Sequence, residues 1–207
     1  YMSRKPKNTQ LIIHQIFLDI GKYEKIPDKW VRNMNVNKKL NRGWRHILWT
    51  DSKVNAFVNK FYPEYKKMIK GFPHKFYLID FARYLILKKM GGVYIDLDVR
   101  CKKAIPPSAL TIIGSSFTNK KAINNNVIRL SHECVSKLLD FSVSEYNRIM
   151  DNKLYLKMPT RRFFYSVSAY MFRKFVLKNK LKSDINFNEY FLDEEAGSWI
   201  GKGGIIK

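Results

Sequence analysis

Two aspartates separated by one residue follow a short apolar run near the middle of the chain. Val93-Tyr94-Ile95 is typical of a buried strand, and Asp96-Leu97-Asp98 comes directly after it. Carboxylates at the carboxyl end of a strand repel one another unless an oxygen-seeking divalent ion lies between them. The triplet therefore predicts a site for Mg²⁺ or Mn²⁺, with coordination positions left open for diphosphate oxygens.

A second polar pair lies on a helix just upstream. Apolar residues recur every three or four positions over Phe76–Met90, and Gly91-Gly92 ends the pattern. Asp80 and Arg83 share one face of this helix. They form either a surface ion pair, which adds little stability, or a pair that holds a sugar through its hydroxyl groups. The neighbouring acidic triplet favours the second interpretation.

The elements around these residues alternate between strands and helices. Strands are expected at Leu11–Phe17, Trp44–Trp49, Val93–Ile95, Thr111–Phe117 and Val127–Leu130. Helices are expected at Pro27–Asn35, Val54–Phe61, Phe76–Met90, Cys134–Met150 and Ser166–Lys180. This order predicts one α/β domain over 11–207, after a polar arm at 1–10, with a largely parallel sheet and helices on both faces. The tail from Phe191 is expected to be an ordered loop.

The chain is strongly basic. It has 39 Lys and Arg against 17 Asp and Glu, a formal charge of +22, which favours polyanionic partners. Most of the lysines are scattered singly, so nucleic acid is not the favoured partner, although a basic module for nucleic acid or anionic glycan remains the alternative. Hydrophobic residues at 45% and aromatic residues at 14% exclude a disordered chain.

Cysteine usage and hydropathy bear on the compartment. Cys101 and Cys134 have no metal-ligand spacing and form no disulfide framework, which suits a soluble protein of the cytoplasm or another reducing compartment. No apolar run approaches the roughly 18 residues of a membrane span. Peripheral association with an acidic membrane, or an anchor on a longer precursor, stays open because the chain begins at Tyr1.

The nineteen residues from Asp80 to Asp98 closely resemble the signature of the DXD-containing sugar transferases, glycosyltransferase family 32. This family includes α-mannosyltransferases and capsular polysaccharide enzymes and is related to glucosylating bacterial toxins. Four other segments are similar to motifs of the family, in the expected order: Ile12–Phe17, Leu48–Asp51, Asn125–Ile128 and Gly197–Trp199.

The resemblance implies a GT-A fold and retaining transfer of a hexose from a UDP- or GDP-sugar to a hydroxyl acceptor. That acceptor would be a glycan, a glycolipid or a protein, and the basic surface suits an acidic one. An inactive or donor-hydrolysing relative is a further alternative. The Thr-Gly-Pro element common in the family's later half is not evident around Tyr165–Tyr170, a region expected to shape the acceptor site.

The resemblance also implies roles for individual residues. The donor-binding residues would be Ile16, Phe17, Trp49, Asp80, Arg83, Tyr94, Asp96, Asn125, Ser198 and Trp199. The catalytic group would be Asp80, Arg83, Asp96 and Asp98. The metal ligands, around Mn²⁺ or Mg²⁺, would be Asp98, Asp96, Glu195 and Ser198.

For several of these residues, the resemblance also implies the part of the donor that each would contact. The base would be lined by Ile16 and Phe17, and the sugar would be held by Asp80 and Arg83. The ribose or metal-bound water would be contacted by Tyr94 and Asp96. The leaving group would be covered by Trp199. The family usually has Trp where Phe17 stands, which leaves the choice of base open. Glu194-Glu195 occupies the region where many members have His, so either acid is a candidate ligand.

Overall fold

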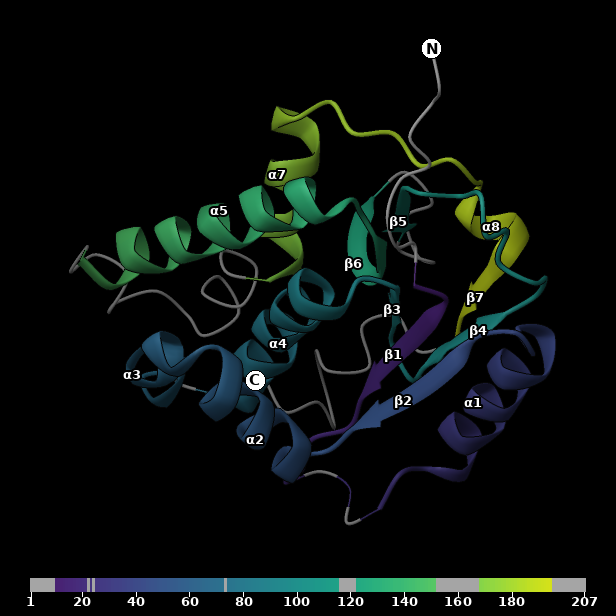
Figure 1. The fold of residues 1–207 in the computed structure, drawn as a ribbon, viewed down its shortest axis with the longest axis horizontal. Helices are drawn as coiled ribbons and strands as arrows, with labels where there is room; N and C mark the ends of the chain where they lie inside the picture. The colour runs from purple at the N-terminus through teal and green to yellow at the C-terminus, as the bar shows by residue number, and fades with distance from the viewer. Residues whose placement is uncertain are drawn as a thin grey trace.

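One central sheet of five strands organises the chain, in the order β2-β1-β3-β6-β5 (Figure 1). The computed structural model describes residues 10–21, 23, 25–72, 74–115, 122–151 and 168–194. The strands are β1 (Ile12–Ile16), β2 (Arg45–Trp49), β3 (Val93–Ile95), β5 (Ile112–Ser115) and β6 (Ile123–Arg129). β1 pairs in parallel with β2 and β3, whereas β6 pairs antiparallel with β3 and β5.

The mostly parallel sheet expected from the sequence is therefore confirmed, with β6 as the one reversed strand among those described. The reversal follows from the short connection between β5 and β6, which consists of residues 116–122 only. A parallel return needs a crossover of about a dozen residues or more, so the short connection imposes an antiparallel pair.

Helices cover both faces of the sheet (Figure 1). The described helices are α1 (Asp28–Leu40), α2 (Asp51–Phe61), α3 (Lys66–Lys70), α4 (Lys75–Met90), α5 (His132–Asp151), α7 (Ala169–Lys178) and α8 (Phe187–Tyr190), with a 3₁₀ turn at Pro63–Tyr65. The larger apolar core joins one sheet face to α2, α4, α5 and α7. The smaller core lies on the other face, against a two-stranded sheet of β4 (Val99–Cys101) and β7 (Phe191–Asp193). No described helix is long and apolar enough to cross a bilayer.

Several boundaries differ from the sequence prediction. The helix expected at Pro27–Asn35 continues to Leu40, and β6 begins at Ile123, before the predicted Val127. The tail predicted to be a loop contains β7, which pairs with the unpredicted β4. Both of these strands have three residues, which is too short for a period-two pattern to be recognised.

Asparagines of α1 tie the helix to the acidic triplet and to β4. Asn33 donates to the carbonyl of Leu97 at 3.3 Å. Four residues on, Asn37 donates to the carbonyl of Val99 at 3.1 Å and accepts from the amide of Cys101 at 2.6 Å. The Asn37 side chain thus pairs with β4 as a neighbouring strand would.

Gly91 and Gly92 set the path from α4 into β3. Both have positive φ, +63° and +83°. A Cβ on Gly92 would lie 2.5 Å from the carbonyl oxygen of Ile12 and 3.2 Å from Nε2 of His14, whereas a Cβ on Gly91 would meet nothing within 4 Å. Only Gly92 therefore allows β3 to approach β1 this closely.

We expect Gly92→Ala to destabilise the protein more than Gly91→Ala. Backbone strain should cost about 1–3 kcal/mol in either variant. The clash with β1 should add about 1–3 kcal/mol for Gly92→Ala alone. Urea unfolding of the two variants beside the parent chain measures the difference. Equal losses would show that close packing of β3 on β1 does not depend on the missing side chain.

Candidate active site

A buried arginine joins α4 to the last residues of β3 and the first residues of β6. Arg83 is 4% exposed, and its Nη1 donates to the carbonyl of Asn125 at 2.6 Å. Its Nη2 lies 2.8 Å from Oδ1 of Asp80 and 3.5 Å from Oδ1 of Asp96. The guanidinium also lies over the ring of Tyr94, 4.4 Å from its centroid. One charged group thereby connects α4, β3 and β6.

Asp80 is held by the same cluster. Its Oδ1 accepts from Nδ2 of Asn125 at 2.8 Å as well as from the arginine, and the residue is 7% exposed. Nδ2 of Asn125 also lies 3.4 Å from the hydroxyl of Tyr84. Among the described residues, no donor bonds to Oδ2 of Asp80. The pair predicted from helix spacing is thus a buried ion pair with one carboxylate oxygen to spare, not a surface salt bridge.

Asp96 lies at the end of β3 in a similar arrangement. The Tyr94 hydroxyl donates to its Oδ1, and its side chain is 27% exposed. Burial raises the pKa of Asp96 to about 6, against the opposing effects of Arg83 and the tyrosine, while the charges of Asp80 and Asp193 raise it further. No described residue donates to Oδ2. This carboxylate would accept a cation, since one would replace lost hydration.

The arginine keeps its charge in this setting. Burial by itself would lower the pKa of Arg83, but the charges of Asp96, Tyr94 and Asp80 raise it above its ordinary value. For the Tyr94 and Tyr84 hydroxyls, burial raises the pKa, so both groups remain protonated. The cluster therefore combines one positive charge with at least two carboxylates, and its balance is negative once Asp96 ionises.

The backbone of the acidic triplet is fixed on both sides. The amide of Asp96 donates to the carbonyl of Asn126 on β6 at 2.8 Å. The carbonyl of Asp98 accepts from the amide of Glu194 at 3.1 Å, just after β7. The triplet is therefore a turn between the central sheet and the small sheet, with its geometry set by hydrogen bonds from elements distant in sequence.

Two polar residues of the site were not predicted from the sequence. Asp193 is 4% exposed and accepts from Nδ2 of Asn126 at 2.9 Å, and the same nitrogen donates to the carbonyl of Ser115 at 3.2 Å. Asp193 belongs to the acidic run that continues through Glu194. That run was the feature of the sequence that could have identified Asp193 as a site residue. Oδ1 of the buried Asn126 has no partner among the described residues.

The residues predicted at the base lie along the opening strands. Ile16 is 4% exposed, and Phe17 is half-buried with its ring 6.5 Å from that of Trp30. Trp49 is 7% exposed, and its indole N–H donates to Nδ1 of His14 at 3.2 Å. The role of Trp49 in donor binding stays a prediction, since its polar atom is already bonded to the core.

Both ring nitrogens of His14 are bonded within the core. Its Nε2 lies 3.1 Å from the carbonyl of Gly91, and burial lowers its pKa to about 4. The neutral ring accepts from Trp49 through Nδ1 and so donates through Nε2. It ties β1 to β2 and to the end of α4.

The predicted metal site is described only in part. Glu195, Ser198 and Trp199 lie outside the described residues. Within the described ranges, no three His, Cys, Asp or Glu side chains are grouped as a metal site. The donor set present still fits a hard divalent cation, because Asp96 and Asp98 supply carboxylate oxygens on one turn and Asp96 has a free Oδ2 with an elevated pKa.

Part of the chain is similar to known sugar transferases. Residues 27–119 match the family described as the glycosyltransferase sugar-binding region containing DXD motif. Inositol phosphoceramide mannosyltransferase 1 of Schizosaccharomyces pombe is 38% identical over 99 residues, which cover 46% of this chain and 30% of that protein. The mannosyl phosphorylinositol ceramide synthase SUR1 of Saccharomyces cerevisiae is 34% identical over 124 residues, covering 60% and 31%.

The chain thus spans about a third of the length of these curated relatives. Among solved structures, the PaToxG glycosyltransferase superposes with a TM-score of 0.52 at 19% identity, covering 82% of this chain and 69% of that one. This likeness concerns the fold, and it confirms the GT-A fold that the resemblance implied. The resemblance is confirmed as well, because residues 27–119 match the sugar-binding region of the DXD-containing glycosyltransferases.

Proposed function

We propose that this protein transfers a hexose from a nucleoside diphosphate sugar to a hydroxyl acceptor, with a divalent cation at the acidic triplet and with retention of configuration. The observation that carries the proposal is the contact between the Asp96-Leu97-Asp98 turn and the buried cluster of Asp80, Arg83 and Asn125. Side chains suited to bind the sugar therefore lie beside the carboxylates suited to hold the diphosphate through a cation.

The described side chains divide the work. Asp80, through its free Oδ2, accepts from hydroxyls of the donor sugar, and Arg83 fixes the orientation of that carboxylate. Asp98 and Asp96 would hold the cation, with Tyr94 orienting Asp96. When bound, the cation neutralises the charge that builds on the departing diphosphate. In a retaining transfer, the acceptor hydroxyl attacks from the face that the diphosphate leaves, with a diphosphate oxygen as the base.

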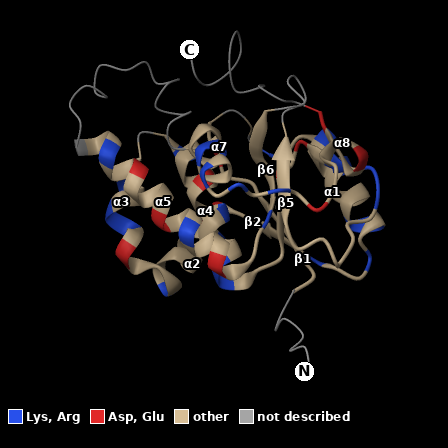
Figure 2. Cartoon of the chain, turned by 90° about the horizontal axis from the view of Figure 1, so that it is seen from above, with Lys and Arg blue, Asp and Glu red and all other residues tan. Residues whose placement is uncertain are grey.

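The relatives suggest the sugar and the acceptor. Two of the similar proteins are named as mannose-transferring enzymes of inositol phosphoceramide, so mannose and a phosphate-bearing glycolipid are the substrates we favour. The charge of +22 suits an acidic acceptor. Figure 2 shows basic and acidic residues interspersed along α2 and α5, and the basic residues of the described part of the chain form no continuous stripe in this view.

Donor binding should require both the metal and Asp98. A UDP- or GDP-sugar at about 100 times its Kd should stabilise the folded state by about 2.7 kcal/mol, or roughly 5–10 °C in Tm for a chain of this size. We expect that shift for one nucleotide only, with Mn²⁺ present, and its loss in Asp98→Asn. Differential scanning fluorimetry over a panel of nucleotide sugars measures it, and Asp140→Asn, an exposed acid on α5, is the matched control.

The same panel separates the competing functions. A basic binding module would respond to charge alone, so its shift would ignore Mn²⁺ and disappear with salt. Chromatography of the released nucleoside diphosphate, with and without an acceptor to which mannose can be transferred, distinguishes a transferase from a donor hydrolase and from an inactive relative. Release that depends on the acceptor supports transfer, whereas release without it identifies a donor hydrolase, and metal-dependent binding without release identifies an inactive relative.

Cation affinity should depend on the ionisation of Asp96. Its pKa is raised to about 6, and only the ionised carboxylate binds a cation. Mn²⁺ affinity should therefore be constant above about pH 7 and fall roughly tenfold for each pH unit below the pKa. Calorimetric titration between about pH 5 and 7.5 tests this. Asp96→Asn should bind Mn²⁺ more weakly, and its Mn²⁺ affinity should show no change of slope near pH 6. A change of slope that persists in this variant would assign the titration to another group.

A further inference from the structure

A β-bulge interrupts the pairing of β6 with β5 beside the acidic triplet. The register of the two strands shifts between Ile113 and Gly114, which leaves residues 125–127 of β6 between two regular pairs. Such a bulge changes the direction of neighbouring side chains. Asn125 bonds to the buried cluster around the arginine, whereas the next side chain, that of Asn126, bonds to the end of β5 and to β7.

The side chain and the main chain of Asn126 both make hydrogen bonds at the acidic turn. Its Nδ2 donates to the carboxylate of Asp193 at 2.9 Å and to the carbonyl of Ser115 at 3.2 Å. Its backbone carbonyl accepts from the amide of Asp96 at 2.8 Å. The side chain therefore joins the central sheet to β7, while the main chain holds the first residue of the triplet.

Asp193 connects this pair to the other end of the triplet. It lies opposite Val99 in the small sheet. The amide of Glu194, the next residue along the chain, donates to the carbonyl of Asp98 at 3.1 Å. The hydrogen bond between Asn126 and Asp193 thus links the elements that hold the two ends of the turn.

The Asn126 amide is held where it lowers stability. The residue is 3% exposed, and its Oδ1 has no partner among the described residues. A Cβ on Gly114 would overlap this oxygen, so only a glycine there leaves room for the amide. A buried acceptor without a partner is unfavourable, and such groups are expected where the site requires them.

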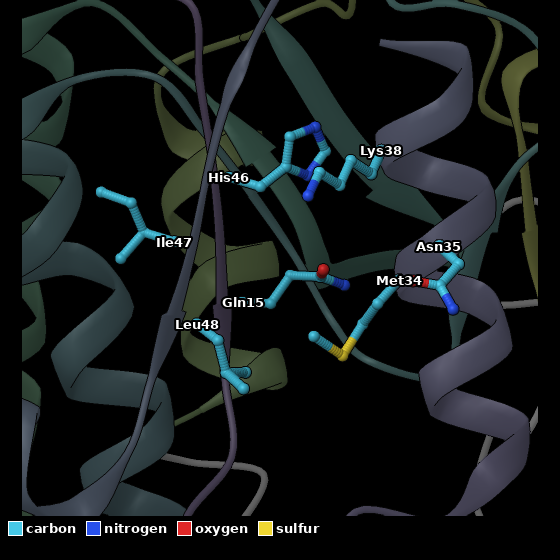
Figure 3. Close-up of a pocket in the computed structure, with 7 residues that line it drawn as sticks. All are labelled: Gln15, Met34, Asn35, Lys38, His46, Ile47 and Leu48. Atoms are coloured by element: carbon cyan, nitrogen blue, oxygen red, sulfur yellow. The ribbon is translucent and has the colours of Figure 1, made fainter. Parts of the chain in front are cut away.

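Gln15 of β1 is a buried amide of the opposite kind. It is also 3% exposed, but its Nε2 bonds to no described residue. In Figure 3 its side chain points toward α1, beside a hollow that shares no lining residue with the acidic cluster. The Gln15 amide therefore joins no described element to the triplet, in contrast to that of Asn126.

We propose that Asn126 and Asp193 are positioning residues of the transfer reaction, whose hydrogen bond sets the relative placement of Asp96 and Asp98 and thereby the affinity for the divalent cation. The inference rests on the proposed function, because it requires a cation at the triplet. Neither side chain has to touch the cation or the sugar, since hydrogen bonds outside the coordination sphere orient the ligands of a metal.

Calorimetric titration of the whole chain with Mn²⁺, after removal of bound metal with EDTA, tests the pair. Asn126→Leu removes the donor and should weaken Mn²⁺ binding about tenfold to a hundredfold. Asn41→Leu is the matched control, because Asn41 is 2% exposed and bonds to the amide of Ile105, not to the triplet. Asn41→Leu and Gln15→Leu should bind Mn²⁺ as the parent chain does. Urea unfolding of the same variants separates a loss of affinity from a loss of stability.

Substitutions of Asp193 separate the hydrogen bond from the charge. Asp193→Asn keeps an acceptor for the Asn126 amide and should lose much less Mn²⁺ affinity than Asp193→Leu. Asn126→Asp places a second carboxylate beside Asp193 and should weaken binding. Adding Asp193→Asn to Asn126→Asp restores a donor and an acceptor in exchanged places, so the double variant should bind Mn²⁺ more tightly than Asn126→Asp alone.

Asp98→Asn in the same titration distinguishes this proposal from the proposed function. If the parent chain and Asp98→Asn bind Mn²⁺ alike, no cation binds at the triplet and both proposals are wrong. The positioning role alone is overturned if Asp98→Asn loses Mn²⁺ while Asn126→Leu binds as tightly as the parent chain. It is also overturned if Asn126→Leu and Asn41→Leu lose affinity alike, or if Asp193→Asn loses as much as Asp193→Leu.

Discussion

The buried charge of Arg83 is the constraint on which the site depends. A guanidinium that is 4% exposed is stable only with nearly all of its polar atoms paired, and here the partners come from α4, β3 and β6. Removing one partner would leave an uncompensated charge in the interior, so the three elements are fixed relative to one another. The same pairing orients Asp80 and Asp96, and leaves each of them a free oxygen.

The acidic triplet is positioned by a second set of contacts that are neutral. Asn33 of α1 bonds to the carbonyl of Leu97, the middle residue of the triplet, and the backbones of Asn126 and Glu194 bond to its ends. These amide hydrogen bonds restrict the backbone of the turn without adding charge to it. A cation that binds there meets a preorganised donor set, which favours binding.

The sequence was sufficient for the features that depend on local pattern. The helix at Phe76–Met90, the strand at Val93–Ile95 and the spacing of Asp80, Arg83 and the triplet are all found in the structure, because periodicity and glycine punctuation are local signals. β4, β7 and the burial of Asp193 were missed. Short strands and buried polar groups depend on partners more than 60 residues away, as with Asn126 and Asp193, and no single-sequence pattern specifies such pairs.

The location of a bound Mn²⁺ is the most direct test of this account. Mn²⁺ added to the isotope-labelled protein with a nucleotide sugar broadens the amide resonances nearest to it, and Mg²⁺ serves as the diamagnetic control. We predict that the signals of Asp96, Leu97, Asp98 and Asn126 disappear first. Selective broadening on α2 or α3, with the triplet unaffected, would contradict the assignment of the donor site.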